Sequence, residues 1–504
     1  MGWKSKLILP YARLVVRKEK HWRARPLEAQ ERIFRYLIDQ GKRTAFGRDH
    51  HFDAIHDYES FKEAVPLRGY EEIKSYIERT MAGELSVLWP GRPQYFSKTS
   101  GTTSGTKYIP LSKESIPTHI NAARNALMFY VVEKNDASVF DGKIMFISGS
   151  PKLEQRGDIR IGRLSGIVNY HVPAYAKANQ LPSYESNCIE DFELKLEKII
   201  DETIDADMRM ISGIPPWVQM YFEKIVKRTG RKVGEVFPNF QVFIYGGVNY
   251  EPYRPVISEL IGRHVDGIET YPASEGFIAY QDTQDEEGLM LNVHGGIFFE
   301  FIPMDEYGKP DARRLSLKEV ELNTNYALVI NNNAGLWSYD IGDMVRFVSK
   351  DPYRIVVTGR TKHFISAFGE HVIGEEVEWA MGTTAEKHGA RVQEFHVAPQ
   401  VTPPEGGLPY HEWLIEFEKE PENPEAFRLD LDKALRSRNV YYDDLIRGRI
   451  LQPLKFRPLR KNAFRKLMHS RGKLGGQNKV PRLSNDRNFA KDLEKYSVDE
   501  EFRS

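Results

Sequence analysis

Cysteine is nearly absent from this sequence, because Cys188 is the single cysteine among 504 residues. A disulfide within the chain needs two cysteines and a cysteine-rich zinc module needs several, so both are excluded. The sequence also lacks any apolar run near the roughly 18 residues that indicate a membrane span. A lone cysteine fits a reducing compartment, and we expect a cytoplasmic protein without a membrane span.

An excess of charge of either sign is also missing. Lys and Arg number 71, Asp and Glu number 71, and the formal net charge is zero. Net charge therefore gives no support to a protein that coats nucleic acid, and we expect no nucleic-acid partner. Charge is uneven locally, since residues 454–482 hold ten Lys or Arg and no Asp or Glu. This stretch is either a solvated basic face or a surface that meets phosphate.

Apolar material is sufficient for a sizeable core. Hydrophobic residues make up 41% of the chain and charged residues 28%, a composition typical of a globular protein. At about 150 residues per domain, the length corresponds to roughly three domain equivalents.

The N-terminal stretch KSKLILPYARLVVRKEKHW, residues 4–22, places apolar residues between basic flanks. It fits either a membrane-surface helix or an amphipathic helix packed on the body of the protein. We favour the packed helix.

Helical and strand-like patterns alternate along most of the chain. Residues 26–80 have apolar positions at helical spacing, and the Ser, Thr and Gly run at 97–107 predicts a loop. Helical patterns at 115–132, 191–203 and 216–228 alternate with the strand-like runs KIMFISG, MRMISG, FQVFIYGG and DGIETY. Strands that alternate with helices predict an α/β fold with a mostly parallel sheet.

Two later segments follow a different pattern. Between Leu289 and Val348 the strand-like runs are closely spaced, which predicts a β-rich subdomain attached to the α/β body. A further break lies near Gly359–Glu370. The helices and strands expected after it predict a separate α+β module of about 140 residues.

The run Thr99–Lys107, TSGTTSGTK, is the strongest local signal. Small residues let backbone N–H groups approach an anion, hydroxyls add donors, and the Lys supplies a positive charge. A Walker phosphate loop needs Gly and Lys adjacent, followed by Ser or Thr. Here Thr106 separates Gly105 from Lys107 and Tyr108 follows, so the spacing argues against a P-loop NTPase.

The same run resembles the phosphate loop of the acyl-adenylate-forming superfamily, in which Ser, Thr and Gly residues are closed by a Lys. Three further segments match this superfamily in the right order: YPASE (271–275), YDIGD (339–343) and a hinge motif at 359–378. Within it, the sequence is most similar to the auxin-responsive acyl-acid amido synthetases of plants and their bacterial homologues. The supporting segments are TSGTTSGTKYIP, ASEGF, AGLWSYDIGD and GGQNKVPRLSNDR, and the resemblance runs from about residue 32 to residue 487.

The resemblance implies the architecture of adenylate-forming enzymes: a large N-terminal α/β domain with a β-rich subdomain, and a small, mobile α+β C-terminal domain. We expect residues 1–360 to bind ATP and the acyl acid, and residues 361–504 to act as a lid. Closure in two orientations would serve two half-reactions.

The resemblance also implies a two-step ligase reaction that uses ATP and Mg²⁺. A small carboxylic acid would attack the α-phosphate of ATP and release pyrophosphate, and the resulting acyl-adenylate would pass its acyl group to an amino acid. Negative charge gathers on phosphate in the first transition state, where preorganised cations, N–H donors and Mg²⁺ stabilise it.

Residues that serve the phosphates are implied by the first two motifs. The expected phosphate contacts are Ser100, Thr102, Thr103 and Lys107. Glu275 would hold Mg²⁺. Gly105-Thr106-Lys107 is one residue shorter than the common superfamily ending Gly-x-x-Lys, so the reach of the Lys is open.

Residues that serve the nucleoside are implied by the other motifs. Tyr271 would stack on adenine, and Asp343 would accept hydrogen bonds from both ribose hydroxyls. Arg360 would add charge-assisted contacts to ribose or phosphate. Lys479, within the basic stretch 454–482, resembles the C-terminal lysine that enters the site for adenylation.

The hinge departs from the superfamily pattern. Lys362 and His363 stand where many members carry acidic residues, and no catalytic role is assigned to His363 or His371.

Two other functions remain open at this stage. An acyl–coenzyme A ligase would use the same adenylation residues with a different acceptor. A nucleic-acid-binding protein would use the basic stretch 454–482, but it leaves the four nucleotide motifs without a purpose. The acyl acid and the acceptor are not encoded by short motifs, because specificity depends on pocket shape. The oligomeric state is also open, and a monomer is compatible with the sequence.

Overall fold

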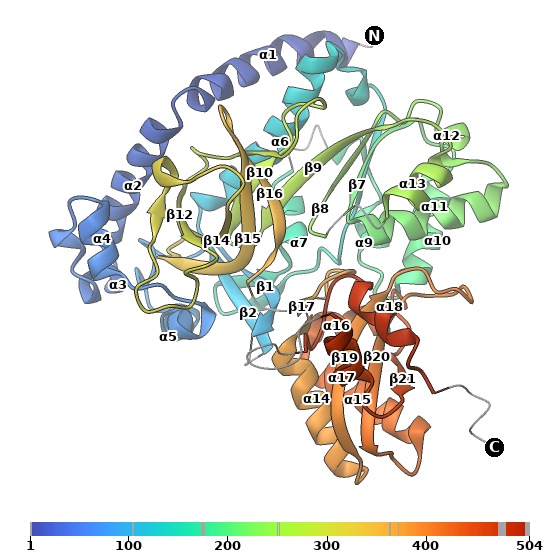
Figure 1. Ribbon diagram of the computed structural model, residues 1–504. Helices are drawn as coiled ribbons and strands as arrows, with labels where there is room; N and C mark the ends of the chain where they lie inside the picture. Colours follow the sequence, from blue (N-terminus) through green and yellow to red (C-terminus); the bar gives the residue numbers. More distant parts are fainter. Residues whose placement is uncertain are drawn as a thin grey trace. The chain divides into compact units, whose positions relative to one another are not determined.

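The computed structural model divides into two compact units (Figure 1). Unit 1 consists of Met1–Thr99, Lys107–Ile189 and Lys195–Thr361, and unit 2 consists of Ser100–Thr106, Glu190–Leu194 and Lys362–Ser504. The structure describes residues 3–102, 105–172, 177–248, 250, 253–361, 364–370, 372–471 and 480–498.

A mixed sheet forms the centre of unit 1, and its described residues make twelve strands in the order β13-β12-β14-β15-β16-β11-β10-β9-β8-β7-β3-β6. The parallel strands are β6 (Gln180–Leu181), β3 (Lys143–Ile147), β7 (Met208–Gly213), β8 (Val242–Gly246) and β9 (Asp266–Ala273). The four strand-like runs of the α/β pattern are therefore confirmed as neighbours in one parallel sheet.

Helices connect the parallel strands, as parallel pairing requires. They are α7 (Leu164–Tyr170), α9 (Tyr184–Asn187), α10 (Phe192–Thr203), α11 (Pro215–Thr229), α12 (Val233–Val236) and α13 (Arg254–Ile261). Pro215 and Pro216 open α11 in the first turn, where a missing N–H leaves no hydrogen bond unmade. Gly230 ends it with φ +68°, a left-handed conformation that Gly adopts without strain.

The strands predicted between Leu289 and Val348 are present, and they extend the same sheet. The antiparallel strands are β10 (Gly276–Tyr280), β11 (Leu289–Leu291), β12 (Ile297–Pro303), β13 (Leu315–Ser316), β14 (Asn325–Asn332), β15 (Tyr339–Lys350) and β16 (Tyr353–Arg360). Strand β10 pairs with β9, and β11 lies between β10 and β16. The β-rich part is thus joined to the parallel part by continuous strand pairing.

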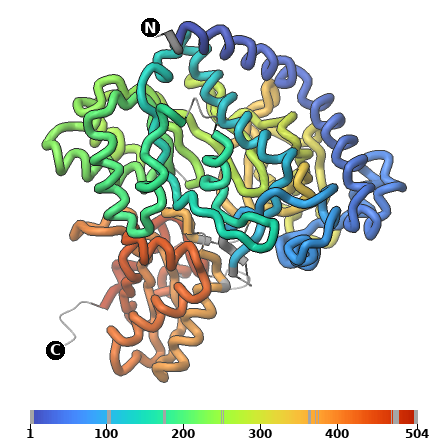
Figure 2. Tube along the Cα trace, turned by 180° about the vertical axis from the view of Figure 1, so that it is seen from behind, coloured from blue at the N-terminus to red at the C-terminus, as the bar shows by residue number. Residues whose placement is uncertain are grey.

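Two long helices cover the sheet near β9 and β10 (Figure 2). Helix α6 (Ser115–Lys134) packs on these strands, and α1 (Trp3–Arg23) packs on α6. Ala12, Val15 and Val16 are buried on the inner face of α1, which confirms the predicted packed amphipathic helix. None of the helices in the described ranges is long and apolar enough to cross a bilayer.

The predicted helical content of residues 26–80 is confirmed by α2 (Pro26–Gly41), α3 (Ala45–Asp49), α4 (Tyr58–Ala64) and α5 (Tyr70–Met81). Their inner faces meet the antiparallel strands in an aromatic core. In that core the ring centroids of Phe34 and Phe298 are 4.9 Å apart, and those of Phe52 and Trp337 are also 4.9 Å apart. Aromatic pairs at such distances add to the stabilisation from apolar burial.

The Ser, Thr and Gly run at 97–107 is mostly strand, so the expected loop is wrong for most of its length. Strands β1 (Tyr95–Thr102) and β2 (Gly105–Leu111) belong to a second sheet with the order β2-β1-β5-β4. Strand β1 pairs in parallel with β5 (Ile159–Gly162), which pairs with β4 (Glu154–Arg156). Pairing with a neighbouring strand overrides a composition of small residues, which local sequence cannot reveal.

Unit 2 contains the predicted α+β module. Its three-stranded sheet consists of β19 (Arg391–Gln400), β20 (Tyr410–Lys419) and β21 (Lys455–Leu459), and a short pair is formed by β17 (Phe364–Ile365) and β18 (Val372–Ile373). Its helices are α14 (Gly374–Lys387), α15 (Pro424–Arg438), α16 (Val440–Arg447), α17 (Ala463–Ser470) and α18 (Asn488–Glu494). Residues 481–484 add an edge beside β19, because Val397 N–H donates to the Arg482 carbonyl and Ser484 N–H donates to the Val397 carbonyl.

Candidate active site

Asp343 is the centre of a polar cluster at the end of the β15–β16 pair. It lies opposite Arg360 in the register of these strands, and its Oδ1 is 2.8 Å from Arg360 Nε. The hydroxyl of Tyr271, on β9, donates a hydrogen bond to Oδ2 of the same carboxylate. One carboxylate therefore joins residues from three separate sequence motifs.

The turn before Asp343 is fixed by its own hydrogen bonds. Gly342 has φ +82°, a conformation that favours Gly, and its N–H donates to Asp340 Oδ1 at 2.8 Å. The Thr361 N–H donates to the Gly342 carbonyl at 2.9 Å. On the other side, the Tyr307 hydroxyl donates to Asp340 Oδ2 at 2.5 Å. Asp340 thus braces the turn that presents Asp343.

Glu275 lies in the turn between β9 and β10. The Asn332 side chain donates to the Glu275 carbonyl at 2.6 Å, and Ser274 Oγ lies 2.9 Å from Ser97 Oγ on β1. These contacts hold the turn at the carboxyl end of β9. In open α/β sheets, ligands bind at the carboxyl ends of the parallel strands.

Lys107 and Glu275 are half-buried groups of opposite charge that interact electrostatically. Burial raises the pKa of Glu275, and attraction to Lys107 and Arg360 opposes that rise. Burial lowers the pKa of Lys107, Glu275 opposes this effect, and repulsion from Arg360 adds to it. Among the described residues, no cation lies within 4.0 Å of the Glu275 carboxylate, so this carboxylate can accept a cation brought by a ligand.

The contacts with Asp343 keep Tyr271 protonated and Arg360 charged. Burial lowers the pKa of the Arg360 guanidinium, but Asp343, Tyr271 and Glu275 outweigh it and raise that pKa above its usual value. Burial raises the pKa of Tyr271 well above its usual range, and the Asp343 carboxylate adds to the rise. Tyr271 therefore stays neutral and donates its hydroxyl proton to the Asp343 side chain.

Tyr339 and Tyr70 belong to the same cluster, and the sequence analysis assigned neither of them a role. Tyr339 is fully buried, and its hydroxyl has no partner among the described residues. Burial raises its pKa well above the usual value, and Glu275 and Tyr70 add to the rise. Lys107 Nζ lies 5.9 Å from the centre of the Tyr70 ring. Tyr339 is the first residue of the YDIGD motif, so the sequence could have marked it as a site residue. No motif marks Tyr70.

The remaining predicted site residues are not placed by side-chain geometry. Ser100 and Thr102 lie at the end of β1, where the structure describes the backbone path. Thr103 and Lys479 lie outside the described residues, as do Lys362, His363 and His371. The roles expected for Ser100, Thr102, Thr103 and Lys479 stay predictions.

Three family models match successive parts of the chain. The GH3 family N-terminal domain matches residues 17–177, the GH3 family central domain matches residues 290–360, and the GH3 family C-terminal domain matches residues 375–488. Together these ranges cover more than half of the chain.

Curated relatives are named as amino acid synthetases or amido synthetases. The jasmonoyl–L-amino acid synthetase JAR4 of Nicotiana attenuata is 24% identical over 383 residues, which cover 63% of this chain and 66% of that relative. A probable indole-3-acetic acid-amido synthetase of Arabidopsis thaliana, GH3.1, is 28% identical over 537 residues, which cover 90% of this chain and 89% of that relative. The chain thus spans slightly less than two thirds of the length of JAR4.

Two solved structures share the fold. The acyl acid amido synthetase AtGH3.15 in complex with 2,4-DB has a TM-score of 0.61 at 15% identity, over 97% of this chain and 96% of that chain. A 2-hydroxyisobutyryl-CoA ligase in complex with 2-HIB-AMP and CoA has a TM-score of 0.60 at 12% identity, over 94% of this chain and 92% of that chain.

Proposed function

The chain belongs to the GH3 family, and from this premise we propose that it is an ATP-dependent acyl acid amido synthetase. In the first step the carboxylate of a small acid attacks the α-phosphorus of ATP, an acyl–phosphate bond forms and pyrophosphate leaves. In the second step the amino group of an amino acid attacks the carbonyl carbon. An amide forms, AMP leaves with the bonding electron pair, and the amine loses a proton.

One observation carries the proposal: residues from distant motifs meet around Asp343. Arg360 and Tyr271 contact its carboxylate directly, and Lys107 and Glu275 interact electrostatically with the same group. A site with two cations, Lys107 and Arg360, beside the carboxylate that we propose to bind the nucleoside suits a reaction in which charge builds up on phosphate.

Different residues of this cluster serve the nucleoside and the phosphates of ATP. Asp343 uses one lone pair on each oxygen for Tyr271 and Arg360, and a carboxylate has further lone pairs for ribose hydroxyls. The hydrogen bond to Asp343 holds the Tyr271 ring for stacking on adenine. Lys107 neutralises phosphate charge, together with the phosphate contacts expected from Ser100, Thr102 and Thr103.

The residues at Glu275 fit a Mg²⁺ ion that arrives with ATP. Burial raises the pKa of this carboxylate, and a bound cation would favour its ionised form. Mg²⁺ commonly binds through one or two carboxylates plus substrate phosphates, and the described residues include no cluster of three or more potential metal ligands. When bound, the ion would neutralise charge on the phosphate oxygens.

The acceptor we propose is an amino acid. The relatives are named as a jasmonoyl–L-amino acid synthetase and a probable indole-3-acetic acid-amido synthetase, and the first name supports this choice. Coenzyme A is the alternative acceptor, because the 2-hydroxyisobutyryl-CoA ligase has the same fold.

Residues 1–360 would bind ATP and the acyl acid, and residues 361–504 would act as a mobile lid that brings Lys479 into the site for adenylation. We propose the cytoplasm as the place of this reaction, in keeping with the single Cys188.

Exchange of labelled pyrophosphate into ATP, screened against a library of carboxylic acids, tests the adenylation step. Lys107→Ala and Glu275→Gln should each reduce exchange by about 100- to 1,000-fold, because each removes a group that stabilises charge at the phosphates. Two matched controls, Lys113→Ala and Glu287→Gln, change side chains that are 82% and 72% exposed and should leave exchange unchanged.

Full exchange in folded Lys107→Ala or Glu275→Gln would remove these residues from the site. Absence of exchange in the wild-type protein with every acid tested would contradict the adenylation step itself. Mass analysis of the product formed with amino acids or with coenzyme A then decides the acceptor.

A further inference from the structure

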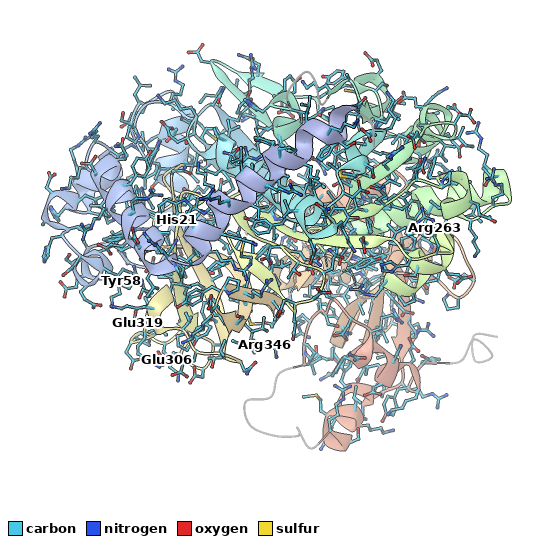
Figure 3. The ribbon with its side chains drawn as sticks, turned by 90° about the horizontal axis from the view of Figure 1, so that it is seen from above. His21, Tyr58, Arg263, Glu306, Glu319 and Arg346 are labelled. Carbon is cyan, nitrogen blue, oxygen red and sulfur yellow. The ribbon has the colours of Figure 1, made fainter. Side chains whose placement is uncertain are left out.

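The outward face of α1 carries an apolar stripe that the packing of unit 1 leaves uncovered. Leu7, Tyr11 and Leu14 are 66%, 46% and 66% exposed. Their spacing of four and three residues places them on one side of the helix. Helix α1 lies along the outside of unit 1 in Figures 1 and 2, and Figure 3 looks onto it near the labelled His21.

Positive charge lies along one side of this stripe and at its C-terminal end. Lys6, Arg17 and Lys18 are exposed, and they form no ion pair with any carboxylate in the described ranges. The single acidic residue of α1, Glu19, is buried and lies 3.2 Å from His294 Nε2. The outer face of the helix is therefore apolar from Leu7 to Leu14 and basic along one side and at its C-terminal end, with no acidic side chain.

The inner face of α1 already has a structural partner. Ala12, Val15 and Val16 pack in a core cluster with residues of α6, and Ser5 Oγ donates to Asp141 Oδ2 at 2.8 Å. The helix is thus anchored to unit 1, and its exposed leucines are not needed for that anchoring.

We propose that the outer face of α1 docks on the surface of an anionic lipid bilayer. An amphipathic helix with Leu and Tyr on one strip and Lys and Arg beside it lies in the bilayer interface, where apolar burial and attraction to anionic headgroups act together. The helix would lie flat on the surface without crossing it, in agreement with the absence of a spanning helix in the described residues.

A second copy of this chain fits the same face less well. A two-fold symmetric contact would place the stripe of one copy against the stripe of the other. In an antiparallel contact the basic side of one helix would lie beside the basic side of the other with no carboxylate of α1 to neutralise it, and such like-charge contacts oppose association. The charge pattern therefore favours an anionic surface over self-association.

Sedimentation with lipid vesicles tests the proposal on the full chain. The wild type should sediment with vesicles of phosphatidylcholine mixed with phosphatidylglycerol and not with vesicles of phosphatidylcholine alone, and added salt should weaken the binding. Leu7→Ser combined with Leu14→Ser, and separately Arg17→Glu combined with Lys18→Glu, should each weaken binding by roughly tenfold or more.

Matched controls change exposed residues elsewhere. Leu429→Ser on α15 changes a leucine that is 53% exposed, and Lys113→Glu changes an exposed lysine outside α1; both should keep wild-type vesicle binding. All the variants should keep the wild-type unfolding temperature, because the substituted side chains face outward.

Three results would overturn the proposal. They are no binding of the wild type to anionic vesicles, equal binding to neutral and anionic vesicles, or a dimer in analytical ultracentrifugation that Leu7→Ser with Leu14→Ser dissociates. The last result would assign the stripe to an interface between copies. None of these readouts depends on ligase activity, so the docking face and the proposed function can fail separately.

Discussion

At the residue scale, Asp343 has two roles, one within the protein and one proposed toward the nucleotide, and a carboxylate has enough lone pairs for both. It pairs with Arg360 and accepts a hydrogen bond from Tyr271, and it is the proposed ribose ligand. Asp343→Asn keeps the shape but replaces an acceptor with an NH₂ donor, which would face either the guanidinium or the Tyr271 hydroxyl. We expect ATP affinity to fall by about tenfold or more, measured by calorimetry.

Asp158→Asn is the control for this change, because Asp158 is 80% exposed on unit 1 and lies outside the cluster. If Asp343→Asn binds ATP with wild-type affinity, Asp343 is a turn residue and no nucleotide ligand.

Lys195 gives a second prediction at this scale. It is 2% exposed, and its Nζ donates to the carbonyls of Ser148 and Asn187 at 2.6 and 2.9 Å. Burial lowers its pKa from 10.5 to about 8. Between those two pH values the unfolded chain holds a proton that the folded chain has released, so the free energy of unfolding should rise with pH.

The expected rise across that window is at most about 3 kcal/mol, at 1.36 kcal/mol per pKa unit. Urea unfolding at several pH values measures it. Lys195→Met should lose the rise, whereas Lys198→Met, at a side chain that is 55% exposed, should keep it. A parallel pH dependence in wild type and Lys195→Met would show that Lys195 has an ordinary pKa.

At the element scale, His396 links β19 to the edge formed by residues 481–484. Its Nδ1 lies 2.7 Å from the Pro481 carbonyl oxygen and its Nε2 lies 3.2 Å from Ser484 Oγ. Burial lowers the pKa of His396 from 6.5 to about 4. As pH falls through that window the unfolded chain gains a proton that the folded chain does not hold, so this edge should lose stability in acid.

Protection factors from hydrogen exchange at the amides of β19 should therefore decline between pH 6.5 and about 4. His396→Gln should weaken the edge at neutral pH and remove most of this decline. His264→Gln, at a side chain that is 87% exposed, is the control. Protection that does not change with pH in the wild type would contradict the assigned role of His396.

Sequence patterns predicted the elements whose signals are local. Helices α6 and α11 begin and end within two residues of the predicted ranges, because apolar spacing and terminal Pro or Gly are visible in the sequence itself. Residues 97–107 were predicted as a loop, but most of them lie in β1 and β2, because strand pairing within the β2-β1-β5-β4 sheet is not visible in the local sequence. The joining of β11 to β16 could not be predicted either, since register between distant strands is a tertiary property.

The candidate site was also predicted only in part. The motifs marked Tyr271, Asp343 and Arg360, and the structure brings Tyr271 and Arg360 into direct contact with Asp343. Their contact with one another was not predictable, because each was expected to face the nucleotide. Tyr70 was missed since its place beside Lys107 depends on the packing of α5 against β2.

At the scale of the whole molecule, the proposed lid can be tested through Lys479. If this residue serves adenylation alone, Lys479→Ala should slow acyl-adenylate formation strongly and leave transfer from a supplied acyl-adenylate to the amine largely intact. A lysine is a compact charge with three donors, and its effect should be confined to the step in which phosphate charge builds up. Single-turnover assays of the two half-reactions measure the difference.

Lys491→Ala, in the same C-terminal region, is the matched control and should leave both half-reactions unchanged. Equal slowing of both half-reactions by Lys479→Ala, or of neither, would count against the adenylation role.

The continuity of the twelve-stranded sheet of unit 1 limits how such chains can be cut and recombined. Strand β11 pairs with β10 on one side and with β16 on the other, so a cut near residue 290 severs a strand inside the sheet. The excised strands β12–β16 would expose a long unpaired edge, which is a template for aggregation. Exchange of this segment between two relatives would preserve the sheet only if β9–β11 and β16 came from the same parent. The antiparallel strands can therefore be exchanged between relatives only together with the parallel strands beside them, and they do not form an independent domain.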